Sequence, residues 1–89
     1  PSGEDLAEVV FSYSAPAARN VEIVGDFTDW ESVQLNPPPG PQGVWMKIFH
    51  LSRGVYQYKF WVDGKKTIDL QNPRFGLCSK GGIASIIEV

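Results

Sequence analysis

Apolar and polar residues alternate along most of this chain with a period of two, which is typical of half-buried β-strands. No convincing stretch shows the 3.6-residue period of an amphipathic helix. The alternating segments are short, and glycine, proline and asparagine separate them at regular spacing. We expect strands over residues 9–13, 21–24, 33–35, 44–49, 55–62, 66–70 and 83–89. About seven short antiparallel strands predict an all-β chain folded as a β-sandwich.

The clearest strand, residues 55–62, ends in the dipeptide Asp63-Gly64. This dipeptide is typical of a two-residue type I′ hairpin, so residues 66–70 are expected to return alongside the strand. Alternation places Tyr56, Tyr58 and Phe60 on one face of the strand, where they serve as core residues. It places Gln57, Lys59 and Trp61 together on the opposite, partly polar face.

The length of 89 residues fits one domain, residues 1–89, with residues 1–6 expected as a flexible N-terminal segment. The chain starts without a methionine, which indicates an excised module of a longer protein. The net charge of -2 lacks the basic footprint of a nucleic-acid binder, and no apolar run is long enough to span a membrane. A single cysteine, Cys78, permits no internal disulfide, which suits a reducing, cytoplasmic location.

The residues that carry chemistry do not assemble into a catalytic or metal-binding motif. Asp26, Asp29 and Glu31 are too few and too widely spaced for a calcium loop. Asp63 and Asp69 have the carboxylates of a glycosidase pair, but a sandwich of this size lacks the cleft that excludes water. The single histidine, His50, has no partner at ligand spacing. We therefore expect no enzyme activity, no metal and no cofactor.

Two motifs together identify a family. A G-x-F-x-x-W motif covers residues 25–30, and a Y-x-Y-K-F-x-V-D-G motif covers residues 56–64. With them, residues 8–89 resemble the glycogen-binding domain of AMP-activated protein kinase beta subunits. They are similar also to the isoamylase-type N-terminal modules of α-glucan enzymes (carbohydrate-binding module family 48). The resemblance implies an immunoglobulin-like (early-set) β-sandwich that binds glycogen, starch or malto-oligosaccharides without catalysis.

The resemblance assigns sugar contacts to two residues. Trp30 matches the tryptophan whose indole stacks on a glucose ring, although its position on a loop also fits a cap on the core. Lys59 matches an outward lysine that donates hydrogen bonds to sugar hydroxyls, although a solvated surface lysine has the same sequence pattern. Trp61 lies in phase with Lys59 and either widens this platform or packs on a neighbouring domain.

This chain departs from the family pattern at several contact positions. Lys66 stands where glycogen-binding members carry a second tryptophan, and we include it in the expected carbohydrate-binding surface. In the late loop, Lys80, Gly82 and Ala84 occupy the positions of an apolar residue, a threonine and an asparagine. Such losses predict a weak, shallow site.

A second hypothesis follows from the same departures. The fold can serve as a protein–protein or inter-domain module of its parent protein once most sugar contacts are gone. An apolar patch around Trp45 or the proline-rich loop 37–41 would then form the contact surface. Exposure of Trp30 and Trp61 on the face of Lys59 would favour sugar binding instead.

Overall fold

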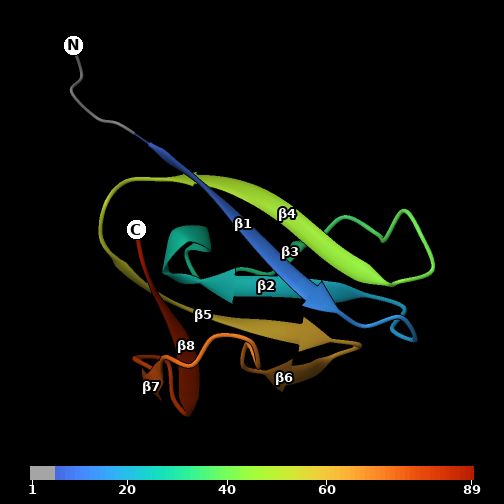
Figure 1. The fold of residues 1–89 in the computed structure, drawn as a ribbon. Coiled ribbons are helices and arrows are strands. Elements are labelled where there is room, and N and C mark those ends of the chain that lie inside the picture. Colours follow the sequence, from blue (N-terminus) through green and yellow to red (C-terminus); the bar gives the residue numbers. More distant parts are fainter. Residues whose placement is uncertain (1–5) are drawn as a thin grey trace.

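The computed structural model describes residues 6–89, which form two antiparallel sheets packed face to face (Figure 1). The smaller sheet pairs β1 (Ala7–Ser14) with β4 (Val44–Leu51). The larger sheet has the strand order β3-β2-β5-β8-β7, with β6 paired to β5. Its strands are β2 (Val21–Gly25), β3 (Val33–Gln34), β5 (Val55–Val62), β6 (Lys65–Thr67), β7 (Phe75–Leu77) and β8 (Ile83–Glu88). The predicted all-β sandwich is confirmed.

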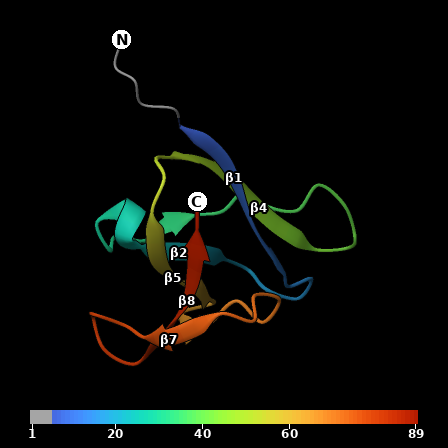
Figure 2. The ribbon, with the colours of Figure 1, turned by 60° about the vertical axis from the view of Figure 1, so that its left-hand side comes forward.

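The two layers separate clearly in a view turned from the first (Figure 2). β1 and β4 form the upper layer, and β2, β5, β8 and β7 lie below them. The 3-10 turn η1 (Asp26–Thr28) follows β2 at one end of the larger sheet. No helix in residues 6–89 has the length and apolar character needed to cross a membrane. The expected N-terminal segment 1–6 falls outside the described residues except for Leu6, which is exposed.

The strand prediction was wrong in two places. β7 was not among the predicted strands, because its three residues around Gly76 are too few to show a period of two. β6 ends at Thr67 rather than at residue 70. It ends there because the backbone N–H of Asp69 donates to the Ser85 hydroxyl, 2.7 Å away, and turns the chain toward β8.

The core is built from aromatic rings that β1, β4, β5 and η1 supply. Phe11 lies with its ring centroid 5.0 Å from that of Phe27 and 4.9 Å from that of Tyr58. Phe60 is fully buried and contacts both Tyr58 and Tyr13. Edge-to-face and offset arrangements of this kind stabilise an aromatic cluster beyond its buried area. Tyr58 and Phe60 therefore occupy the core as predicted.

Trp45 belongs to this core, and its predicted role as a surface contact was wrong. Its side chain is 5% exposed, and its indole N–H donates to the carbonyl of Ala15 at 3.1 Å. In β4 the inward positions are shared by Trp45, Phe49 and Leu51, whereas Met46 and Ile48 face outward. Apolar residues lie on both faces of this strand, so alternation alone did not distinguish them.

The hairpin between β5 and β6 has the predicted type I′ geometry. Asp63 and Gly64 have φ values of 50° and 84°, both in the left-handed region that this turn requires. The Asp63 carboxylate also accepts hydrogen bonds from the backbone N–H groups of Arg19 (2.8 Å) and Asn20 (2.9 Å). One side chain therefore holds the loop between β1 and β2 against the hairpin.

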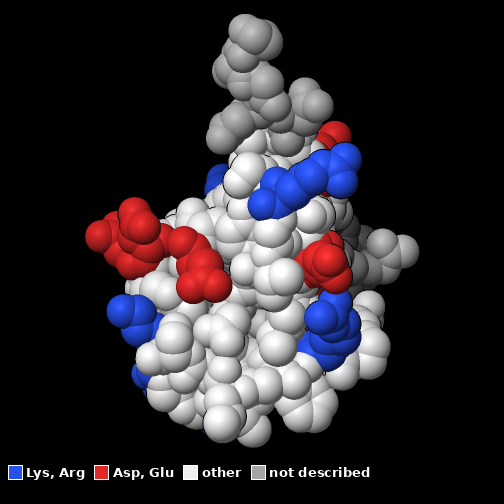
Figure 3. Space-filling model, turned by 90° about the vertical axis from the view of Figure 1, so that its left-hand side faces the viewer, with Lys and Arg blue, Asp and Glu red and all other residues white. Residues whose placement is uncertain are grey.

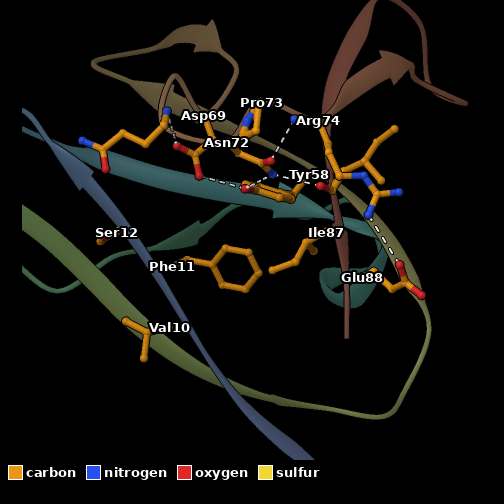
Figure 4. Close-up of a pocket in the computed structure, with 12 residues that line it drawn as sticks. Val10, Phe11, Ser12, Tyr58, Asp69, Asn72, Pro73, Arg74, Ile87 and Glu88 are labelled. Atoms are coloured by element: carbon orange, nitrogen blue, oxygen red, sulfur yellow. Dashed lines mark hydrogen bonds and ion pairs between the residues drawn. The ribbon is translucent and has the colours of Figure 1, made fainter.

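A partly buried polar network surrounds the Tyr58 hydroxyl (Figure 4). The Tyr58 hydroxyl donates to Asp69 at 2.8 Å and accepts from the Asn72 amide at 3.0 Å. The same amide donates to the carbonyl of Ile86 in β8 at 2.9 Å. These residues line a pocket of about 530 Å³ that opens between β1 and β8. Asp69 therefore joins the 69–74 turn to two strands, β5 through Tyr58 and β8 through Ser85.

Burial raises the pKa of the Tyr58 hydroxyl well above its usual value, and the neighbouring Asp69 carboxylate adds to this effect. Folding therefore favours the protonated phenol, and its stabilisation is complete below the unfolded-state pKa of about 10. As the pH rises above that value, the contribution of Tyr58 to the free energy of unfolding is expected to fall by up to about 1.4 kcal/mol per pH unit. Urea unfolding between neutral and alkaline pH measures the slope.

The matched variants are Tyr58→Phe and Tyr13→Phe. Tyr58→Phe is expected to flatten the alkaline decline, and Tyr13→Phe is expected to retain it, because Tyr13 does not belong to this network. An identical alkaline slope in wild type and Tyr58→Phe would contradict the assignment.

Candidate functional site

The outer face of β5 carries the residues that we expected to bind sugar. β5 pairs with β2 on one side, so that Lys59 lies opposite Val24 and Trp61 opposite Glu22. On its other side Trp61 lies opposite Lys66 of β6. Because opposite residues of an antiparallel pair share a face, Lys59, Trp61 and Lys66 belong to one surface. This surface lies on the far side of the sheet from the aromatic core.

Lys59 is buried on this surface, so its alternative interpretation as a solvated lysine was wrong. Its side chain is 7% exposed, and its Nζ donates to the carbonyl of Gly81 at 2.8 Å. The loop 78–82 covers it and closes on itself, since the N–H of Cys78 donates to Gly82 (2.8 Å) and that of Gly81 to Cys78 (2.9 Å). The ammonium therefore has a defined position at the edge of this loop.

Gln57 tethers the loop to the strand, a role that the sequence did not reveal. Its amide nitrogen donates to the carbonyl of Leu77 at 2.8 Å, and its amide oxygen accepts from the N–H of Ser79 at 3.2 Å. Gln57 lies two residues before Lys59 on the same face. The two side chains together hold both ends of the loop on β5.

Trp30 is half-buried and lies just beyond η1. Asp29 and Trp30 both adopt left-handed backbone conformations, with φ of 55° and 60°. The backbone N–H of Trp30 donates to the carbonyl of Gly25 at 3.0 Å. Trp30 therefore lies in a tight turn that hydrogen-bonds back to the last residue of β2.

Asp26 connects Trp30 to β5. One carboxylate oxygen accepts from the indole N–H of Trp30 at 3.1 Å, and the other accepts from the backbone N–H of Gln57 at 2.8 Å. The indole is therefore positioned relative to the strand that carries Lys59. The sequence suggested Asp26 only as part of an acidic cluster, and the i, i+4 spacing to Trp30 is the signal that was available.

Trp61 and Lys66 form a second unit of the surface. Lys66 Nζ lies 5.6 Å from the centroid of the Trp61 ring, within the range of a cation–π interaction. Trp61 is half-buried, and Lys66 is exposed. The indole of Trp61 is thus partly covered by an ammonium group rather than fully open to solvent.

A pocket of about 350 Å³ opens beside the loop 78–82. Its lining residues are Lys59, Lys66, Thr67, Ile68, Lys80, Gly81, Gly82 and Ile83. Two of the four predicted site residues, Lys59 and Lys66, therefore meet at one cavity. Trp30 and Trp61 lie outside this lining, and Ala84 is buried. Residues 6–89 contain no cluster of three or more side chains suited to hold a metal ion.

Comparison with known proteins identifies the family. The profile described as "Glycogen recognition site of AMP-activated protein kinase" matches residues 7–89. A 1,4-alpha-glucan branching enzyme from Lactobacillus acidophilus is 34% identical over 80 residues, which cover 86% of this chain and 12% of the enzyme. A 1,4-alpha-glucan branching enzyme from Synechococcus elongatus is 38% identical over 58 residues, which cover 63% of this chain and 8% of the enzyme.

The chain thus spans about an eighth or less of the length of these curated relatives. The matched family is one of binding modules, and the relatives are enzymes. The family profile covers the whole sandwich from β1 to β8, and both sequence motifs fall within it. This chain therefore belongs to the family of the glycogen recognition domain of AMP-activated protein kinase, a family of non-catalytic glucan-binding modules.

Proposed function

We propose that this chain binds α-glucan chains on the outer face of β5 through Trp30, Lys59, Trp61 and Lys66. The observation that carries the proposal is the network of Asp26, which joins the Trp30 indole to the strand of Lys59. An indole held in place before the ligand arrives loses little conformational freedom on binding. The ligand is glycogen, starch or a malto-oligosaccharide, in line with the family and with the branching enzymes that share the module.

We infer that the chain itself has no catalytic activity. Both candidate carboxylates have structural partners, since Asp63 accepts two backbone N–H groups and Asp69 accepts the Tyr58 hydroxyl. A glycosidase acid needs a carboxyl group free to face the sugar across a groove. Hydrolysis or branching would then belong to other domains of the parent protein.

The charge on the face shown in Figure 3 agrees with a glucan as ligand rather than a nucleic acid or a membrane. On the face in Figure 3, acidic and basic side chains form small separate groups between wide uncharged areas. Nucleic-acid binders instead gather lysine and arginine into continuous stripes. We further propose a cytoplasmic location, because a single free cysteine suits a reducing compartment.

Titration of the chain with maltoheptaose and β-cyclodextrin tests the proposal, with tryptophan fluorescence as the readout. We expect saturable binding with a Kd of roughly 0.1–1 mM, a range that corresponds to about 4 to 5.5 kcal/mol. Cellohexaose, whose glucose units are β-linked, is the matched control and is expected not to bind. Absence of binding to both α-glucans at millimolar concentration would contradict the proposed function.

Asp26→Ala is expected to weaken maltoheptaose binding about five- to tenfold, because the variant removes the acceptor that orients Trp30. Glu31→Ala is the matched control, since Glu31 is an exposed acid on the same loop. Calorimetry measures both affinities, and thermal melts verify that both variants fold. Equal affinity of Asp26→Ala and wild type would show that the carboxylate does not position the indole.

The alternative function, an inter-domain contact, is favoured by a different surface. Val10 and Ile48 are cross-strand neighbours on the outer face of the β1–β4 sheet, and Met46 lies two residues along. Their side chains are 51%, 47% and 42% exposed. This face is opposite to that of Lys59, so both functions are compatible. Hydrogen exchange of β1 and β4 is compared between the parent protein and the isolated chain. Slower exchange in the parent protein would support a neighbouring domain on this face.

A further inference from the structure

The pocket beside the loop 78–82 is lined by three lysines and no acidic residue. Lys59 is buried, and its Nζ donates a hydrogen bond to the Gly81 carbonyl at 2.8 Å, although an ammonium group has three donors. Lys66 and Lys80 are exposed at the rim. Within residues 6–89 the one ion pair joins Arg74 to Glu88, which are not part of this pocket.

The two acidic residues that lie next to β5, Glu22 and Asp26, have other partners. Glu22 lies across Trp61 and accepts from the side-chain amide of Asn20 at 3.0 Å. Asp26 holds Trp30 and the backbone of β5. The three lysine ammonium groups therefore line one pocket without an acidic side chain to balance their charge. A buried ammonium group has lost hydration, and a bound anion would compensate for that loss.

Gly82 places no side chain between the Lys59 ammonium and the pocket that both residues line. A Cβ at this position would lie 3.5 Å from Lys59 Nζ, so any larger side chain would occupy the space in front of the charge. Gly82 has φ of 73° and Gly81 φ of 104°, conformations that favour glycine at both positions. The double glycine thus both shapes the loop and leaves the space next to the ammonium free of side chains.

We propose that this pocket receives a phosphomonoester carried by a glucose residue of the bound α-glucan. The inference rests on the proposed function, because it names the substrate class of the same face. A phosphate monoester carries up to two negative charges and three acceptor oxygens, which match three ammonium donors. Lys66 is also in contact with the Trp61 ring, so the anion would lie next to the aromatic platform of the glucan.

Calorimetric titration of the chain with maltoheptaose and with maltoheptaose carrying one 6-phosphate tests the proposal. We expect the phosphorylated sugar to bind at least about tenfold tighter at about 20 mM salt, and this preference to shrink at about 500 mM salt. Lys80→Gln is expected to reduce the preference about threefold or more, since it removes an exposed rim charge without altering the core. Lys65→Gln, a lysine of β6 outside the pocket, is the matched control and is expected to keep the preference.

The outcomes separate the two proposals. Equal binding of both sugars overturns the phosphate pocket and leaves glucan binding intact. Binding of neither sugar overturns the proposed function and the phosphate pocket together. Inorganic phosphate and glucose 6-phosphate are titrated as well. If either binds as tightly as the phosphorylated heptaose, the pocket is a site for small phosphates, and the proposal that the phosphate is carried by a glucan is overturned. A preference that Lys80→Gln reduces and Lys65→Gln preserves supports the proposal.

Discussion

Replacement of Trp30 by alanine is expected to weaken maltoheptaose binding by about thirtyfold or more, which corresponds to about 2 kcal/mol. The indole is half-buried in the turn that follows η1, and its N–H donates to the Asp26 carboxylate. Sugar hydroxyls gain little from exchanging water for protein, so the apolar face of the ring is expected to supply most of the net affinity. Calorimetric titration measures the loss.

Two further variants make this result specific. Trp30→Phe retains an aromatic face but not the indole N–H, and it is expected to bind with intermediate affinity. Trp61→Ala is expected to have a smaller effect than Trp30→Ala, because Lys66 partly covers the Trp61 ring. If binding survives Trp30→Ala and fails in Trp61→Ala, the platform lies on the strand instead of the loop.

Phe60→Ala is expected to destabilise the chain by about 3–5 kcal/mol. Phe60 is 0% exposed and contacts the rings of Tyr58 and Tyr13, so its removal leaves a cavity between the two sheets. Natural domains have free energies of unfolding of about 0.05–0.15 kcal/mol per residue. In a chain of 89 residues this single variant would remove a large part of the total stability.

Urea unfolding, followed by circular dichroism, measures the change for Phe60→Ala. Ile48→Ala is the control, because Ile48 is 47% exposed on the outer face of β4 and leaves no cavity. That variant is expected to change stability by less than about 1 kcal/mol. A loss below about 1 kcal/mol for Phe60→Ala would contradict the central position of this residue in the core.

Most of the fold was predictable from the sequence because local signals agreed with the tertiary structure. The alternation in β5 and the Asp-Gly turn specified both the inward rings of Tyr58 and Phe60 and the hairpin to β6. Trp45 was misplaced because Val44 and Met46 on either side are also apolar. Only the packing of β4 against β1 and the Ala15 carbonyl decides which of these side chains points inward.

The site was less predictable, because its geometry depends on contacts distant in sequence. Lys59 had the correct face, but its burial comes from a loop about twenty residues later, held there by Gln57. Alternation within one strand carries no information about a loop that folds over it. The link from Trp30 through Asp26 to β5 likewise joins residues 31 positions apart, and no local pattern predicts it.

The eight residues of β5 contribute to two different surfaces, one on each face of the strand. Tyr58 and Phe60 hold the sandwich together, and Gln57, Lys59 and Trp61 between and beside them shape the outer surface. Because alternate side chains point in opposite directions, a change at 59 or 61 is expected to alter the outer surface with little effect on the aromatic core. Selection for a new ligand can therefore act on every second position of this strand while the scaffold is inherited unchanged.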